Sequence, residues 1–153
     1  MTIKYQRILV PLDGSELGES ALAHAMYLAL LSGAEVTLLS VVPTIEHVIG
    51  SAQMPVPIDI QWNVLKAQAL QYLTGVVRRS ESGASKVHVA VELGGEAEII
   101  LAVAAREQTD LIAMSTHGRS GVRRWVLGSI AEKVLHAAST PVLLIRAPLI
   151  TGE

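Results

Sequence analysis

The sequence predicts a single α/β domain: a doubly wound parallel sheet of five strands, in the order 3-2-1-4-5, with helices on both faces. Strand-like and helix-like segments alternate along the 153 residues, which is the pattern of right-handed crossovers between parallel strands. Hydrophobic residues make up 50% of the chain, yet Phe is absent and only two Trp and three Tyr occur. Val, Ile, Leu and Ala must therefore fill the core, as in sheets that are covered on both faces. Because no internal repeat or linker divides the chain, we expect residues 1–153 to form one domain.

The beginning of the chain predicts two buried strands and the helix between them. The apolar run Ile8–Leu12, which ends at Asp13-Gly14-Ser15, predicts the first strand. Apolar residues then recur at helical spacing over Leu17–Leu31, and Ser32-Gly33 ends this helix. The mostly apolar run Val36–Val42 predicts the second strand.

The middle of the chain begins with an irregular segment. Thr44–Ile60 contains two prolines and has no clean period, so it predicts a loop. Apolar residues recur on one helical face over Trp62–Arg79 and predict the second helix. After a polar turn over Ser80–Ser85, apolar and polar residues alternate over Val87–Glu92. This alternation predicts a third strand nearer the edge of the sheet.

The last third of the chain continues the same alternation. Gly94-Gly95 breaks the third strand, and Ala97–Ala104 has the apolar spacing of a third helix. Asp110–Thr116 predicts the fourth strand, Gly128–Ala138 the fourth helix, and Pro141–Arg146 the fifth strand.

Composition and charge exclude several classes of function. The formal net charge is −2 and the pI is about 6.2, so no broad basic field attracts nucleic acid or anionic lipid. The absence of Cys excludes disulfides, thiolate metal sites and cysteine nucleophiles. No signal peptide is visible, and no apolar run reaches the ~18 residues that span a bilayer. We therefore expect a cytoplasmic protein that binds neither nucleic acid nor membranes.

The expected fold indicates where a ligand would bind. In open parallel sheets, ligands lie beyond the carboxyl ends of the strands, where the strand order reverses. The segments that meet this description are Asp13–Glu16, Val41–Pro43 and Ser115–Ser129.

The last of these segments has the composition of an anion site. Gly118 and Gly121 permit unusual backbone geometry and close approach of a phosphate to main-chain N–H groups. Gly128-Ser129 opens the fourth helix, whose free amides and dipole favour an anion, and Ser129 could cap this helix or donate its hydroxyl to phosphate. We expect valine at Gly128 to occupy the phosphate position and abolish binding without unfolding. The same residues also suit a plain turn and cap, so spacing alone leaves both interpretations open.

Other nucleotide-binding signatures are missing. No Gly-x-x-x-x-Gly-Lys-Ser/Thr string of a P-loop occurs, and no Gly-x-Gly-x-x-Gly follows the first strand.

Four segments together resemble the universal stress protein family. They are Thr116-His117-Gly118-Arg119-Ser120-Gly121, Gly128–Val134, the first strand and turn Ile8–Ser15, and the last strand Pro141–Arg146. ATP-binding members of that family have a Gly-x-x-Gly, nine residues, Gly-Ser/Thr pattern. Gly118 and Gly128-Ser129 match the second and third glycines, whereas Ser115 stands where the pattern has its first glycine.

The resemblance implies a set of nucleotide-binding residues. Asp13 would lie near the ribose or near a Mg²⁺ bound to the phosphates, since a carboxylate is a hard oxygen ligand. Val41 would present its backbone to the adenine edge. For Asp13 a helix cap or turn residue is the alternative, and for Val41 the strand core. The full set comprises Pro11, Asp13, Val41, Ser115, Thr116, His117, Gly118, Arg119, Gly121, Gly128, Ser129 and Ile130.

The resulting functional hypothesis is an ATP-binding stress or regulatory protein that holds ATP with Mg²⁺. We expect at most slow hydrolysis or autophosphorylation, because no positioned base is visible and a loop histidine such as His117 is more often a turn or packing residue. The alternatives are an interaction protein of the same fold that needs no nucleotide, and a true ATPase or phosphotransferase. The resemblance also implies a homodimer through the fifth strand, Val142–Arg146, although this edge need not be the only interface.

Overall fold

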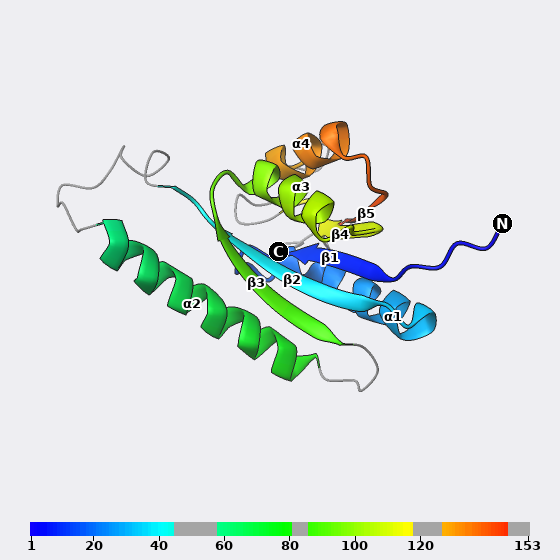
Figure 1. The fold of residues 1–153 in the computed structure, drawn as a ribbon, viewed down its shortest axis with the longest axis horizontal. Helices are drawn as coiled ribbons and strands as arrows, with labels where there is room; N and C mark the ends of the chain where they lie inside the picture. Colours follow the sequence, from blue (N-terminus) through cyan, green and yellow to red (C-terminus); the bar gives the residue numbers. More distant parts are fainter. Residues whose placement is uncertain (45–57, 81–85, 118–126, 147–153) are drawn as a thin grey trace, which may run out of the picture.

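A computed structural model, which describes residues 1–44, 58–80, 86–117 and 127–146, shows a five-stranded sheet with strand order β3-β2-β1-β4-β5 (Figure 1). All four strand pairings are parallel. The predicted fold class and strand order are therefore confirmed. The elements along the chain are β1 (Arg7–Pro11), the 3₁₀ helix η1 (Gly18–Ala21), α1 (Leu22–Ser32), β2 (Glu35–Val42), α2 (Ile58–Arg79), β3 (Val87–Leu93), α3 (Glu96–Arg106), β4 (Leu111–Ser115), α4 (Ser129–Ala137) and β5 (Val142–Ile145).

Helices cover the two faces of the sheet in pairs, with α1 and α2 on one face and α3 and α4 on the other (Figure 1). Because successive side chains of a strand point to opposite faces, β1 contributes to both layers. Ile8 and Val10 pack with α1 and α2, whereas Leu9 packs with α3 and α4. The central strands β1 and β4 are consequently apolar on both sides, which explains their continuous hydrophobic runs.

The first predicted helix is divided in two. Gly18–Ala21 forms a 3₁₀ turn whose i→i−3 bonds run from the Glu19 and Ser20 amides to the carbonyls of Glu16 and Leu17, each 3.2 Å long. The α-helix proper starts at Leu22. It ends as predicted, because Gly33 has a φ of +72° and its amide bonds the Ala29 carbonyl at 2.8 Å.

The loop predicted over Thr44–Ile60 is wrong at its end, since residues 58–60 already belong to α2, while residues 45–57 lie outside the described residues. The first turn contains Asp59, which suits the positive end of the helix dipole. Apolar periodicity could not reveal this turn, because Ile60 is 56% exposed. The other predicted boundaries differ from the observed ones by a residue or two, as is usual at element ends.

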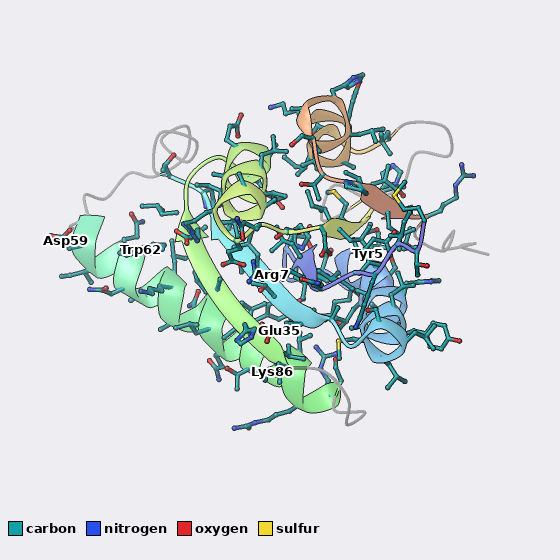
Figure 2. All side chains as sticks on the ribbon, turned by 45° about the vertical axis from the view of Figure 1, so that its right-hand side comes forward. Tyr5, Arg7, Glu35, Asp59, Trp62 and Lys86 are labelled. Carbon is teal, nitrogen blue, oxygen red and sulfur yellow. The ribbon has the colours of Figure 1, made fainter. Side chains whose placement is uncertain are left out.

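At the end of the sheet where the parallel strands begin, polar side chains bind backbone amides and one another. The Asp110 carboxylate accepts the backbone N–H groups of Gln6 and Arg7, with a distance of 2.8 Å to Gln6. Glu35 and Lys86 lie beside each other at the starts of β2 and β3, 3.6 Å apart (Figure 2). The cleft lies at the opposite end of the sheet, where the strands finish.

Candidate functional site

A cleft of about 670 Å³ opens at the carboxyl ends of β1, β2 and β4, where the strand order reverses. Its volume lies within the range of small-molecule sites, roughly 300–1,000 Å³. Every predicted site residue that the structure describes lines this cleft: Pro11, Asp13, Val41, Ser115, Thr116, His117, Gly128, Ser129 and Ile130. Gly118, Arg119 and Gly121 lie outside the described residues.

Asp13 forms one wall of the cleft, directly after β1. Its Oδ1 accepts the Ser15 amide at 2.9 Å and the Ser15 hydroxyl at 2.5 Å, which is a side-chain turn closed by aspartate. The Ser15 Oγ in turn accepts the Gly18 amide at 3.0 Å. Gly18 itself lies so close that a Cβ there would meet Asp13 Oδ1 at 2.5 Å. Asp13 is thus a turn residue and not a helix N-cap, a position that Leu17 occupies for η1.

Val41 places backbone groups at the second wall, on β2. In a parallel strand, successive residues direct their N–H and C=O alternately to the two neighbours. The Leu39 carbonyl accepts the Leu12 amide at 2.8 Å on the β1 side, and the Val42 carbonyl accepts the Gly94 amide at 3.0 Å on the β3 side. By this alternation Val41 directs its backbone groups to the β1 side, where β1 has already ended.

The start of α4 forms the third wall. Gly128 is the N-cap residue, and no side-chain cap is present, so Ser129 is the first helical residue and not the cap. The Gly128 amide donates to the Thr116 carbonyl at 2.9 Å, and the first intrahelical bond runs from the Glu132 amide to the Gly128 carbonyl. The first helical amides therefore have no intrahelical acceptor, and their residues line the cleft. These are the amides of Ser129, Ile130 and Ala131.

The reason for glycine at position 128 is a close backbone contact. Gly128 has φ −58° and ψ 146°, which any residue can adopt. A Cβ at this position, however, would meet the Thr116 carbonyl oxygen at 2.6 Å. A side chain at position 128 would therefore collide with the backbone at the end of β4. The sequence alone predicted a collision with the phosphate instead.

Ser115, at the end of β4, is buried, with 7% of its surface exposed. Its Oγ lies 3.0 Å from the Ser20 Oγ and accepts a long bond of 3.4 Å from the His117 amide. The His117 ring turns to its neighbour, with Nδ1 3.0 Å from the Thr116 hydroxyl.

Several residues of the cleft were missed by sequence reasoning. Lys133 lies one turn after Ser129 on the same face of α4 and adds a positive charge to the rim. Glu96 and Glu98 line the cleft from the first turn of α3. Gly94, with a φ of +152°, and Gly95 complete this side. The Gly94-Gly95 break at the end of β3 was the available signal, but a glycine pair at this position also simply ends a strand.

The described part of the chain contains no group of three or more His, Asp or Glu side chains that could hold a metal ion by themselves. A single carboxylate such as Asp13 suits the way Mg²⁺ is normally bound, through one or two carboxylates together with substrate phosphates.

Within residues 1–44, 58–80, 86–117 and 127–146, no helix is long and apolar enough to cross a membrane.

Fold and site together define a doubly wound α/β protein with a ligand cleft at its topological switch point, formed by a carboxylate turn, a strand end and a helix N-terminus. The chain belongs to the universal stress protein family, whose model matches residues 4–146. The resemblance noted in the sequence is thereby confirmed.

Two proteins of Methanocaldococcus jannaschii are among the relatives of the chain. Universal stress protein MJ0531 is 32% identical, with coverage of 94% of this chain and 84% of the relative. Universal stress protein MJ0577 is 29% identical, with coverage of 95% and 98%. The solved structure of MJ0577 superimposes with a TM-score of 0.83, covering 96% of this chain and 99% of that one. A universal stress protein solved in complex with cAMP is 18% identical, with a TM-score of 0.63 and coverage of 95% and 100%, and so shares the fold.

Proposed function

We propose that this protein binds ATP together with Mg²⁺ in the cleft and serves as a cytoplasmic nucleotide-dependent regulatory protein of stress responses. The observation that supports this most is that first-turn amides of α4, which have no intrahelical acceptor, and the Asp13 carboxylate lie in one cleft. Amides and a helix dipole stabilise phosphate, whereas a carboxylate near phosphates requires a cation between them.

Each wall has a role in this proposal. The N–H and C=O of Val41 match the acceptor and donor on the edge of adenine. Asp13 holds the ribose or the Mg²⁺. The phosphates lie against the first turn of α4, with the Ser129 hydroxyl and Lys133 beside them. The Gly-Ser pair at 128–129 matches the pattern of the family's ATP-binding members, which further supports ATP.

A cyclic mononucleotide is the nearest competing ligand, since a protein of the same fold was solved with cAMP. On the α4 side of the cleft, Lys133, the helix dipole and a Mg²⁺ at Asp13 would neutralise several phosphate charges of ATP where cAMP has one. Glu96 and Glu98 also line the cleft, so the phosphates must lie on the α4 side, away from these two carboxylates. The decisive experiment has two parts. Freshly purified protein is denatured and any released nucleotide is identified by mass spectrometry. The emptied protein is then titrated with ATP, ADP, AMP and cAMP, with and without Mg²⁺, by calorimetry. ATP should bind most tightly, and only with Mg²⁺ present; no binding of any adenine nucleotide would leave the interaction-protein alternative.

Lys133 provides a test of phosphate charge. We expect Lys133→Ala to weaken ATP binding by about fivefold, or ~1 kcal/mol for an exposed charge-assisted contact, while AMP binding changes less than twofold. Lys133→Arg keeps the charge and should retain most of the affinity. Calorimetric titration of each variant with ATP and AMP makes the comparison. Equal losses for both ligands would place Lys133 away from the distal phosphates.

The proposal includes a homodimer through β5. Among the strands that the structure describes, β5 pairs only with β4 and forms an edge of the sheet. The Ile112 amide bonds the Pro141 carbonyl and the Thr116 amide bonds the Ile145 carbonyl, so by alternation the backbone of Val142 faces the outer edge. Val142→Pro removes an N–H that faces outward, at the first residue of an edge strand, where proline is tolerated. We expect this variant to raise the dissociation constant of the dimer at least tenfold. Sedimentation velocity measures this. A dimer of unchanged strength would move the interface elsewhere.

A further inference from the structure

Two serines from distant parts of the chain join the walls of the cleft. Ser115, at the end of β4, and Ser20, in η1, have hydroxyl oxygens 3.0 Å apart, although 95 positions separate them in sequence. The Ser20 Oγ also donates to the Leu17 carbonyl at 2.8 Å. On the other side, the Ser115 Oγ accepts the His117 amide. A continuous chain of polar contacts therefore runs from the crossover after β4 to η1.

This contact is well placed to affect ligand geometry. Ser115 is only 7% exposed, and a buried hydroxyl is tolerated because it is hydrogen bonded. The η1 end of the link is itself attached to the Asp13 turn, since the Gly18 amide donates to the Ser15 Oγ and Ser15 donates to Asp13 Oδ1. Ser20 and Ser115 therefore form a direct polar link between the carboxylate wall and the start of the crossover that leads to α4.

Other contacts of η1 attach it to α2. Glu19 accepts the Tyr72 hydroxyl of α2 at 2.7 Å and is paired with Arg79 at 3.3 Å. Burial raises the pKa of Tyr72, and the hydrogen bond to Glu19 raises it further, so the phenol remains a donor. Because η1 is fixed to α2 in this way, the hydroxyl pair connects the phosphate side of the cleft to a rigid support.

We propose that Ser20 and Ser115 are positioning residues, which hold the Asp13 turn and the start of the crossover at the separation that a Mg²⁺–polyphosphate requires. The inference rests on the proposed function. It also gives a role to the serine that stands where the family pattern has its first glycine. A ligand that touches both walls, such as Mg²⁺–ATP, depends on this separation, whereas AMP, which lacks the distal phosphates, depends on it little.

The test is a double-mutant cycle in which the affinities for two ligands are measured. Ser20→Ala, Ser115→Ala and the double variant are titrated with Mg²⁺–ATP and with AMP by calorimetry, and urea unfolding records their stability. Each single variant should weaken Mg²⁺–ATP binding about five- to tenfold and AMP binding less than twofold, and the double variant should be no weaker than either single one. Ser20→Thr keeps the hydroxyl and should restore the affinity. Ser32→Ala removes a comparable hydroxyl, whose 2.7 Å bond to the Leu28 carbonyl lies at the far end of α1, and should leave both affinities unchanged.

The outcomes separate the two proposals. If the wild-type protein binds no adenine nucleotide, the proposed function fails and this inference with it. If the wild-type protein binds Mg²⁺–ATP but the single variants bind it equally well, or lose affinity additively or equally for both ligands, the positioning role is overturned and the proposed function stands. Ser115→Gly restores the family's glycine and should lose affinity like Ser115→Ala; a gain would also overturn the inference. The Ser20 variants decide the matter if the buried Ser115 variants do not fold.

Discussion

Replacing Gly128 by alanine is expected to reduce Mg²⁺–ATP affinity by about 100-fold and to destabilise the domain by about 1–3 kcal/mol. A single Cβ suffices, because it would lie 2.6 Å from the Thr116 carbonyl oxygen, closer than any real contact allows. The backbone at Thr116 or at the start of α4 must then shift. That shift displaces the amides of Ser129 and Ile130 and breaks the 2.9 Å bond from the Gly128 amide to the same carbonyl. Calorimetric titration and urea unfolding measure the two effects.

Gly75 provides the matched control. It lies inside α2, and a Cβ there would meet nothing within 4 Å. Gly75→Ala should therefore leave ATP affinity unchanged and stabilise the helix by up to about 1 kcal/mol. If Gly128→Ala bound Mg²⁺–ATP as tightly as Gly75→Ala, the α4 amides would not be the phosphate site. A variant at Gly128 that lost stability but not affinity would lead to the same conclusion.

Gly128 shows which features of the site can be predicted from the sequence and which need coordinates. The position of this glycine, after a strand and before a helix, predicted either a turn and cap or an anion site, because the signals of a turn and a helix start lie in neighbouring residues. The resemblance to the family favoured the anion site. The reason for glycine there depends on the Thr116 carbonyl, twelve residues earlier, and required coordinates. Gly128→Val consequently tests the backbone of the crossover as much as the space for phosphate.

The fold was predictable for a related reason. Buried strands such as β1 and β4 are apolar on both faces, so composition alone marks them. The start of α2 was not predictable, because its first turns are exposed and have no apolar period to detect. The pair Ser20 and Ser115 was equally invisible, since nothing local to either serine indicates a partner 95 positions away. Sequence patterns therefore identified elements and single residues of the site but not the contacts that set its dimensions.

The second large effect is expected at Asp13, where substitution by asparagine separates charge from shape. Asparagine retains an oxygen that can accept the Ser15 amide and hydroxyl, which Asp13 Oδ1 accepts at 2.9 and 2.5 Å, so the turn should persist. The loss of a hard anionic ligand should weaken Mg²⁺–ATP binding by about 10- to 100-fold and make binding nearly insensitive to EDTA. Asp13→Ala also removes the acceptor and should cost about 1 kcal/mol more in stability.

Asp110→Asn is the matched control for this comparison, because Asp110 likewise accepts backbone amides, those of Gln6 and Arg7, but at the amino-terminal edge of the sheet. It should lower stability without changing the Mg²⁺ dependence of ATP binding. Titrations with ATP in Mg²⁺ and in EDTA, on Asp13→Asn, Asp13→Ala and Asp110→Asn, make the distinction. Should Asp13→Asn keep the full Mg²⁺ dependence of the wild-type protein while Asp13→Ala loses affinity, the carboxylate would serve only to shape the turn after β1. The cation would then be held by the phosphates without help from Asp13, and the specificity of the cleft for polyphosphate would rest on α4 and Lys133 alone.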